Sequence, residues 1–77
     1  MIKLFSATWC EPCKGLKRLI KANKLEDKTE VIDIDSPKGS EEARKLGVRG
    51  IPMLYDTETG GKIIGNINLA QLKEVYN

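Results

Sequence analysis

The fold and the chemistry of this 77-residue chain are both indicated by one short stretch, Trp9-Cys10-Glu11-Pro12-Cys13-Lys14. It follows a short apolar segment, residues 2–6, and precedes a segment whose apolar residues recur at helical spacing. The chain has no other cysteine. A lone C-x-x-C pair in an α/β pattern indicates a redox couple, in which one sulfur attacks a disulfide and the other resolves the mixed disulfide.

Apolar runs separated by turn-forming residues predict strands at residues 2–6, 31–34, 52–55 and 62–64. Helices are expected between these strands and at the carboxyl end, over residues 11–23, 40–47 and 68–76. The order β-α-β-α-β-β-α predicts one α/β domain over residues 1–77. Its mixed four-stranded sheet would be flanked by three helices.

Capping residues locate the ends of the second and third helices. Ser40 is predicted to cap the second helix, and Gly47 to close it in a left-handed conformation. Asn68 and Gln71 resemble a capping box at the start of the third helix. The side chains expected to face inward from that helix are Leu69, Leu72 and Val75.

Composition excludes several classes of protein. The chain is 40% hydrophobic and 31% charged, as in ordinary soluble domains, and its net charge of +2 gives no indication of nucleic-acid binding. The first residues lack the pattern of a signal peptide, and no apolar run approaches the roughly 20 residues that span a bilayer. We therefore expect a protein of the cytoplasm, a compartment in which thiols are kept reduced. We expect no membrane or nucleic-acid partner.

Two motifs together resemble the thioredoxin superfamily: W-C-x-P-C-K at residues 9–14 and G-I-P at residues 50–52. The order of elements and the spacing between motifs also fit, so the resemblance covers nearly the whole chain. Full thioredoxins carry an additional N-terminal strand and helix, and in length this chain is closer to a glutaredoxin. The resemblance implies a monomeric thiol–disulfide oxidoreductase without a cofactor. It would reduce protein disulfides and be recharged by a flavin-dependent thioredoxin reductase.

The two cysteines are expected to have different roles. Cys10 falls at the N-cap of the first helix, where the amide of Cys13 and the positive helix end favour a thiolate, so Cys10 is the predicted nucleophile. Cys13, inside the first turn, would resolve the mixed disulfide. Pro12 fits the first turn. Glu11 disfavours the thiolate and Lys14 favours it. Thioredoxins usually have glycine at the position of Glu11. Because a less stable thiolate makes a weaker oxidant, we predict a reducing couple, nearer about −270 mV than −120 mV.

The resemblance also implies a substrate groove beside the cysteines. Pro52 would be a cis proline, and Ile51, with Gly50 before it, would pair its backbone with the substrate chain. Gly65 would keep the groove open. Trp9 is predicted to be a half-exposed platform for partners rather than a core aromatic residue.

One position departs from the family pattern. Thioredoxins bury an aspartate on the first strand, six residues before the nucleophile, and here that residue is Leu4. The chain also lacks histidine. Proton transfer would then use water or a carboxylate such as Glu11, and we expect slower resolution at low pH.

The first helix also carries a basic stripe, Lys14, Lys17, Arg18 and Lys21. The stripe is either a solvated face or a surface that steers acidic partners.

Two other functions are compatible with a C-x-x-C pair. A glutaredoxin would be recharged by glutathione, but the order Glu11-Pro12 follows thioredoxins, and the segment 65–68 lacks the acid that holds glutathione. A zinc site usually needs four ligands, so only a dimer that combines two C-x-x-C pairs could complete one.

Overall fold

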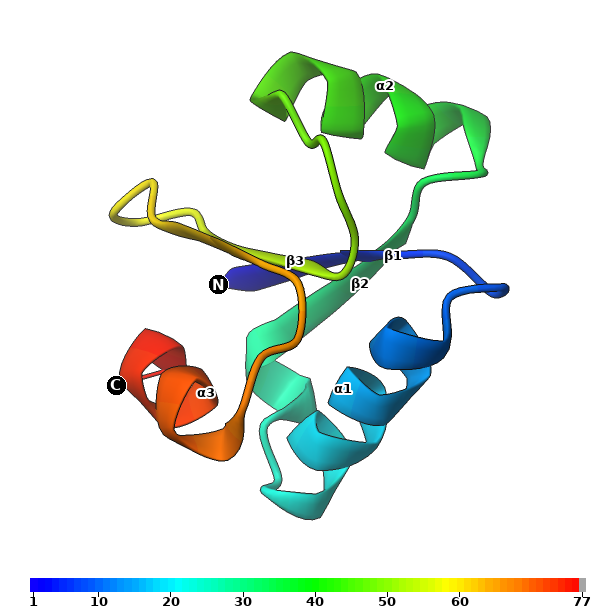
Figure 1. Ribbon diagram of the computed structural model, residues 1–77. Coiled ribbons are helices and arrows are strands. Elements are labelled where there is room, and N and C mark those ends of the chain that lie inside the picture. Colours follow the sequence, from blue (N-terminus) through cyan, green and yellow to red (C-terminus); the bar gives the residue numbers. More distant parts are fainter. Residues whose placement is uncertain (77) are drawn as a thin grey trace.

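Strands and helices alternate along residues 1–76, the part of the chain that this computed structural model describes (Figure 1). The strands are β1 (Ile2–Ser6), β2 (Thr29–Asp33), β3 (Met53–Asp56) and β4 (Lys62–Ile64). The helices are α1 (Glu11–Ala22), α2 (Pro37–Leu46) and α3 (Leu69–Tyr76), with a 3-10 turn at Glu26–Lys28 that the sequence analysis did not anticipate. The predicted order β-α-β-α-β-β-α is confirmed.

The four strands form one mixed sheet in the order β2-β1-β3-β4. The central strand β1 pairs in parallel with β2, where Leu4 lies opposite Val31. It pairs antiparallel with β3, which forms a hairpin with β4. The active-site motif therefore follows a central strand, and β2 lies at one edge of the sheet.

The helices cover the sheet on both faces, α2 on one and α1 with α3 on the other (Figure 1). Side chains alternate along a strand, so Leu4 and Phe5 of β1 enter different cores. The core beside α1 and α3 includes Leu4, Leu16, Ile20, Leu54 and Leu72. The core beside α2 includes Phe5, Ile32, Ala43 and Met53. This packing holds the start of α1 at the carboxyl end of β1.

The helix ends confirm some capping predictions and correct others. Ser36, not Ser40, caps α2: its hydroxyl oxygen accepts the Gly39 amide at 2.9 Å, and Pro37 is the first helical residue. The prediction of Ser40 was wrong because proline fits the first helical position, so the helix starts three residues earlier, at Pro37. Gly47 ends the helix with φ +69°, as predicted.

The third helix begins as predicted. Asn68 and Gln71 exchange hydrogen bonds between side chain and backbone, at 3.0 Å and 2.8 Å, and form a capping box. Leu72 is fully buried, and Val75 packs against the core. Leu69 is 40% exposed, so the expectation that it faces inward was wrong.

Candidate active site

The cysteine pair lies where the chain leaves β1 and enters α1. Cys10 is the N-cap residue, with an extended backbone (φ −90°, ψ 107°). Its sulfur accepts a hydrogen bond from the amide of Cys13 at 3.2 Å. The predicted cap is therefore confirmed: the sulfur satisfies one of the amides that every helix start leaves without a partner.

Cys10 and Cys13 are joined by a disulfide, with Cα atoms 5.2 Å apart. The two residues differ in accessibility: Cys10 is 5% exposed and Cys13 is fully buried. A partner's sulfur can approach Cys10 more readily than Cys13. The disulfide is the oxidised form of the pair, and it takes up two electrons when it is reduced to two thiols.

A second segment, residues 50–52, packs beside the disulfide on the α2 side of the sheet. Ile51 packs against the cysteines, and the peptide bond between Ile51 and Pro52 is cis, as predicted. The amide of Gly65 donates to the carbonyl of Pro52 at 3.0 Å. Gly65 has φ +97°, a conformation that favours glycine. A Cβ atom on Gly50 would lie 3.2 Å from the Ile64 side chain, so this stretch also lies close to β4.

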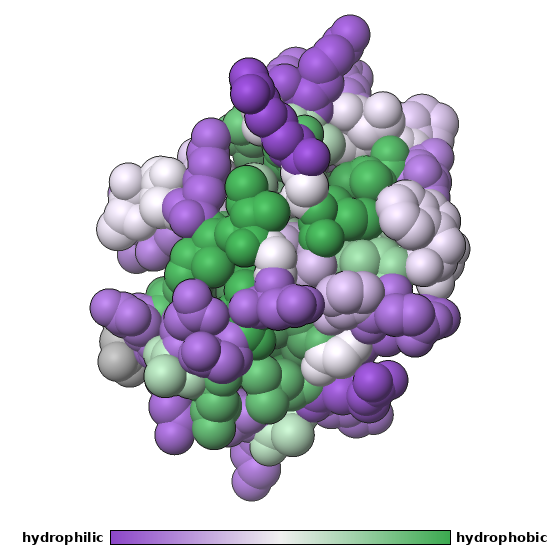
Figure 2. All heavy atoms as spheres, viewed as in Figure 1, coloured by the Kyte–Doolittle hydropathy of each residue, from purple (hydrophilic) through white to green (hydrophobic). Residues whose placement is uncertain are grey.

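Apolar surface surrounds this region. Figure 2 shows it gathered over the middle of the face, between α2 above and α1 and α3 below, with hydrophilic residues around it. The strand β4 crosses the front of this view and carries Ile64, which is 53% exposed. A surface of this kind fits a protein partner better than a small polar ligand.

Trp9 is 64% exposed, which confirms that it is not a core aromatic residue. Its indole Nε1 donates to the Asp35 carboxylate at 2.8 Å. No sequence motif indicated this role for Asp35. The available signal was its position just after β2, because parallel strands β1 and β2 end at the same edge of the sheet. Asp35 therefore orients the ring beside the disulfide.

The charged residues of the motif pair with each other. The Lys14 amine lies 3.0 Å from the Glu11 carboxylate, and both side chains are solvent-exposed. Each charge is therefore directed in part to the other and screened by water, which limits its effect on Cys10.

No buried acid or base assists the cysteines within residues 1–76, where the buried polar residue is Ser6. Leu4, at the position of the family's aspartate, is fully buried in the apolar core beside α1. No group of three or more His, Cys, Asp or Glu residues in the described part of the chain could hold a metal ion. None of its helices is long and apolar enough to cross a membrane.

Comparisons with known proteins agree on one family. The family model described as "Thioredoxin" matches residues 1–76. Thioredoxin from Buchnera aphidicola subsp. Baizongia pistaciae is 36% identical over 78 residues, which cover 95% of this chain and 72% of the relative. Thioredoxin from Rickettsia typhi is 32% identical and covers 95% and 71%. The crystal structure of oxidised thioredoxin O1 from Arabidopsis thaliana superposes with a TM-score of 0.76 at 28% identity, covering 96% of this chain and 71% of that one.

Proposed function

This chain belongs to the thioredoxin family and is a thiol–disulfide oxidoreductase, and we propose that Cys10 is its nucleophile and Cys13 its resolving cysteine. The observation that carries the assignment is the asymmetry of the pair. Cys10 occupies the helix N-cap and is the more accessible residue of the two, at 5% exposed, whereas Cys13 is fully buried. A thiolate at a helix N-cap is stabilised by the amides and by the helix dipole.

The reaction has two exchange steps. The Cys10 thiolate attacks one sulfur of a substrate disulfide, so that a Cys10–substrate bond forms and the first substrate thiolate leaves. Cys13, as a thiolate, then attacks the Cys10 sulfur and releases the second substrate thiolate. The substrate gains two electrons and, after protonation, two protons. The protein is left with the Cys10–Cys13 disulfide.

We assign substrate binding to the surface beside Cys10. Ile51 packs on the disulfide and lies outside β3, which begins at Met53, so its backbone is placed to pair with an extended substrate. Gly50 and Gly65 border the same stretch without a side chain. Trp9 offers an exposed aromatic surface beside the same site. Glu11, Pro12 and Lys14 adjust the reactivity of the cysteines and do not take part in the exchange.

Membership of the family implies disulfide-bearing protein substrates and a reductase partner that returns the electrons. The glutaredoxin alternative is not favoured, because the matching proteins are thioredoxins. We propose that the electron source is a flavin-dependent reductase and that the chain acts as a cytoplasmic monomer. The electron source is tested by comparing turnover with a thioredoxin reductase and NADPH against turnover with glutathione and its reductase. Faster turnover with glutathione would contradict it.

The roles of the cysteines are tested by trapping the mixed disulfide. Cys13→Ser is expected to accumulate a covalent complex with a disulfide substrate, because the resolving thiol is missing. The matched variant Cys10→Ser is expected to form no complex under the same conditions. Non-reducing gel electrophoresis and intact mass spectrometry measure the complex. If Cys10→Ser forms it and Cys13→Ser does not, the two roles are reversed.

A further inference from the structure

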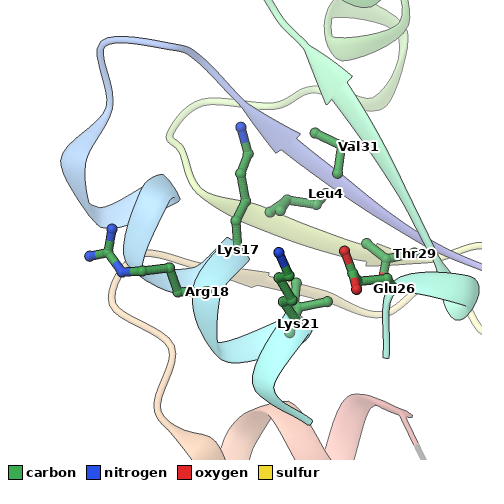
Figure 3. A pocket seen from close by; sticks show the side chains of 8 residues that line it. Leu4, Lys17, Arg18, Lys21, Glu26, Thr29 and Val31 are labelled. Carbon is green, nitrogen blue, oxygen red and sulfur yellow. The ribbon is translucent and has the colours of Figure 1, made fainter. Parts of the chain in front are cut away.

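A pocket of about 390 Å³ lies between α1 and β2 (Figure 3), and neither Ile51 nor Gly65 lines it. Its apolar lining consists of Leu4 and Ile20, which are buried beneath it, and Val31, which is exposed, and Lys17 and Lys21 of α1 line it as well. We call these five residues the α1–β2 groove. Nothing in the reaction at Cys10 and Cys13 uses them.

The groove exists because α1 does not cover the edge of the sheet. Leu16 and Ile20 of α1 pack with Leu4 and Leu54 of the strands β1 and β3. Val31 lies opposite Leu4 on the edge strand β2, so both side chains point to the α1 face. The helices within residues 1–76 leave Val31 54% exposed. An aliphatic side chain on an open sheet edge can bury its surface only against a partner.

The groove is positively charged. In Figure 3 the Lys17 side chain extends beside Leu4 and Val31, and Lys21 stands nearer the 3-10 turn. Arg18 also lines the pocket, with its guanidinium group directed away from Val31. The acidic residue on the lining is Glu26. Among residues 1–76, the ion pairs are Lys3–Glu42, Lys14–Glu11 and Lys45–Glu41. The lysines of the groove therefore keep their charge available for an incoming anion.

We propose that the α1–β2 groove docks an acidic segment of the protein substrate that carries an aliphatic side chain. The aliphatic group covers the exposed Val31 side chain, and neighbouring carboxylates face Lys17 and Lys21. Charge complementarity and the apolar surface both favour this occupant over a neutral peptide. The inference rests on the proposed function, because it names the substrates that the cysteines would reduce preferentially.

The distance to the cysteines suits such a contact. Lys17 lies four residues after Cys13 and Lys21 eight residues after it, which places them about 6 Å and 12 Å further along the axis of α1. An extended peptide covers that span in about two to four residues. Measured along the axis of α1, a substrate held at Cys10 therefore needs only a few further residues to extend as far as Lys17 and Lys21.

The test compares two disulfide peptides of equal length. The acidic peptide carries two Glu residues and a Leu near the disulfide. In the neutral peptide, Gln replaces each Glu and Asn replaces the Leu. For the wild type we expect a higher kcat/KM with the acidic peptide. The double variant Lys17→Gln/Lys21→Gln should lower that value about fivefold and leave the neutral peptide nearly unchanged. Val31→Thr, which keeps the side-chain shape, should lower it about twofold to threefold.

Two controls separate the groove from net charge. The variant Lys38→Gln/Lys73→Gln removes the same charge from exposed positions outside the groove and should leave the preference for the acidic peptide unchanged. Glu26→Gln should increase that preference about twofold. High salt should weaken the preference.

Equal kcat/KM for both peptides, or equal losses in the groove and control variants, would overturn the proposal. So would a preference that Val31→Thr leaves unchanged. If Cys10→Ser still reduced the neutral peptide, the proposed function itself would be wrong, and the two failures are therefore distinguishable.

Discussion

The starts of α1 and α2 are built alike, yet only one of them is reactive. Each follows one of the two parallel strands, β1 or β2, and each has an extended cap residue, Cys10 or Ser36. In α1 the Cys10 sulfur accepts the Cys13 amide at 3.2 Å, and in α2 the Ser36 hydroxyl accepts the Gly39 amide at 2.9 Å. Both helices have a proline in the first turn. The same backbone arrangement thus holds a redox couple in one place and a structural cap in the other.

The third helical residue distinguishes the two starts. Cys13 is buried beside Cys10 and joined to it by the disulfide. Gly39 is buried as well, but a Cβ atom there would lie 1.9 Å from the Asp33 carbonyl oxygen. The start of α2 therefore leaves no space for a side chain, whereas the start of α1 leaves space for a second sulfur. The capped backbone supports the chemistry, and the space at the third position allows it.

The largest effect should come from Cys10→Ser, which gives α1 the same cap residue type that Ser36 provides in α2. Cys10→Ser keeps an oxygen that can cap α1. It should nevertheless remove the reduction of protein disulfides, to below about one thousandth of the wild-type rate, because the nucleophile is gone. Turnover with a reductase measures the loss. The reverse change, Ser36→Cys in the Cys10→Ser background, should restore nothing, since Gly39 supplies no second sulfur. Restored turnover would show that a cap sulfur alone suffices.

The second prediction concerns the ionisation of the thiols, which affects the start of α1 and has no counterpart at the Ser36 cap of α2. Thiols must ionise before they attack, and no buried base assists them within residues 1–76. The single-turnover rate of substrate reduction should therefore fall between about pH 8 and pH 5, by up to about tenfold per pH unit. Stopped-flow measurements across this range test it. A rate independent of pH would reveal a base that the structure does not show.

The third prediction concerns the space at the start of α2. Gly39→Ala forces a methyl group onto the Asp33 carbonyl and should lower the free energy of unfolding by about 2–3 kcal/mol. The matched change in α1 is Gly15→Ala, where the nearest group is the Arg18 guanidinium at 3.9 Å. It should stabilise the protein by about 0.5–1 kcal/mol, because alanine favours helix. Urea denaturation of both variants gives the values, and equal effects would mean that the Asp33 carbonyl does not exclude a side chain at Gly39.

The smallest effect should come from a surface charge beside the reactive cap. Glu11→Gly removes a negative charge that disfavours the Cys10 thiolate and frees Lys14 from its ion pair. The reduction potential should rise, by about 10–20 mV, because exposed charges contribute little. Lys38→Gln, at the start of α2, should leave the potential unchanged. A redox titration against glutathione decides the sign, and a fall after Glu11→Gly would contradict the electrostatic argument.

The sequence predicted local features well and long-range ones only through the resemblance. The cap at Cys10, the capping box at Asn68 and the end of α2 at Gly47 all depend on residues within a few positions of each other. Ser36 was missed because Pro37 fits both the end of an extended segment and the first turn of a helix. The cis Pro52 was predicted from the family motif and not from local preferences, which favour trans.

By itself, the sequence determined that two sulfurs would meet at a helix start, because cap and third helical residue are neighbours in any helix. It also determined the alternation of strands and helices, through the spacing of its apolar residues. Only the tertiary structure decided what surrounds the sulfurs. Asp35 reaches Trp9 across 26 residues of sequence, and Ile51 reaches the disulfide, because the sheet brings separate strand ends together. The α1–β2 groove likewise depends on where α1 packs and which edge it leaves open.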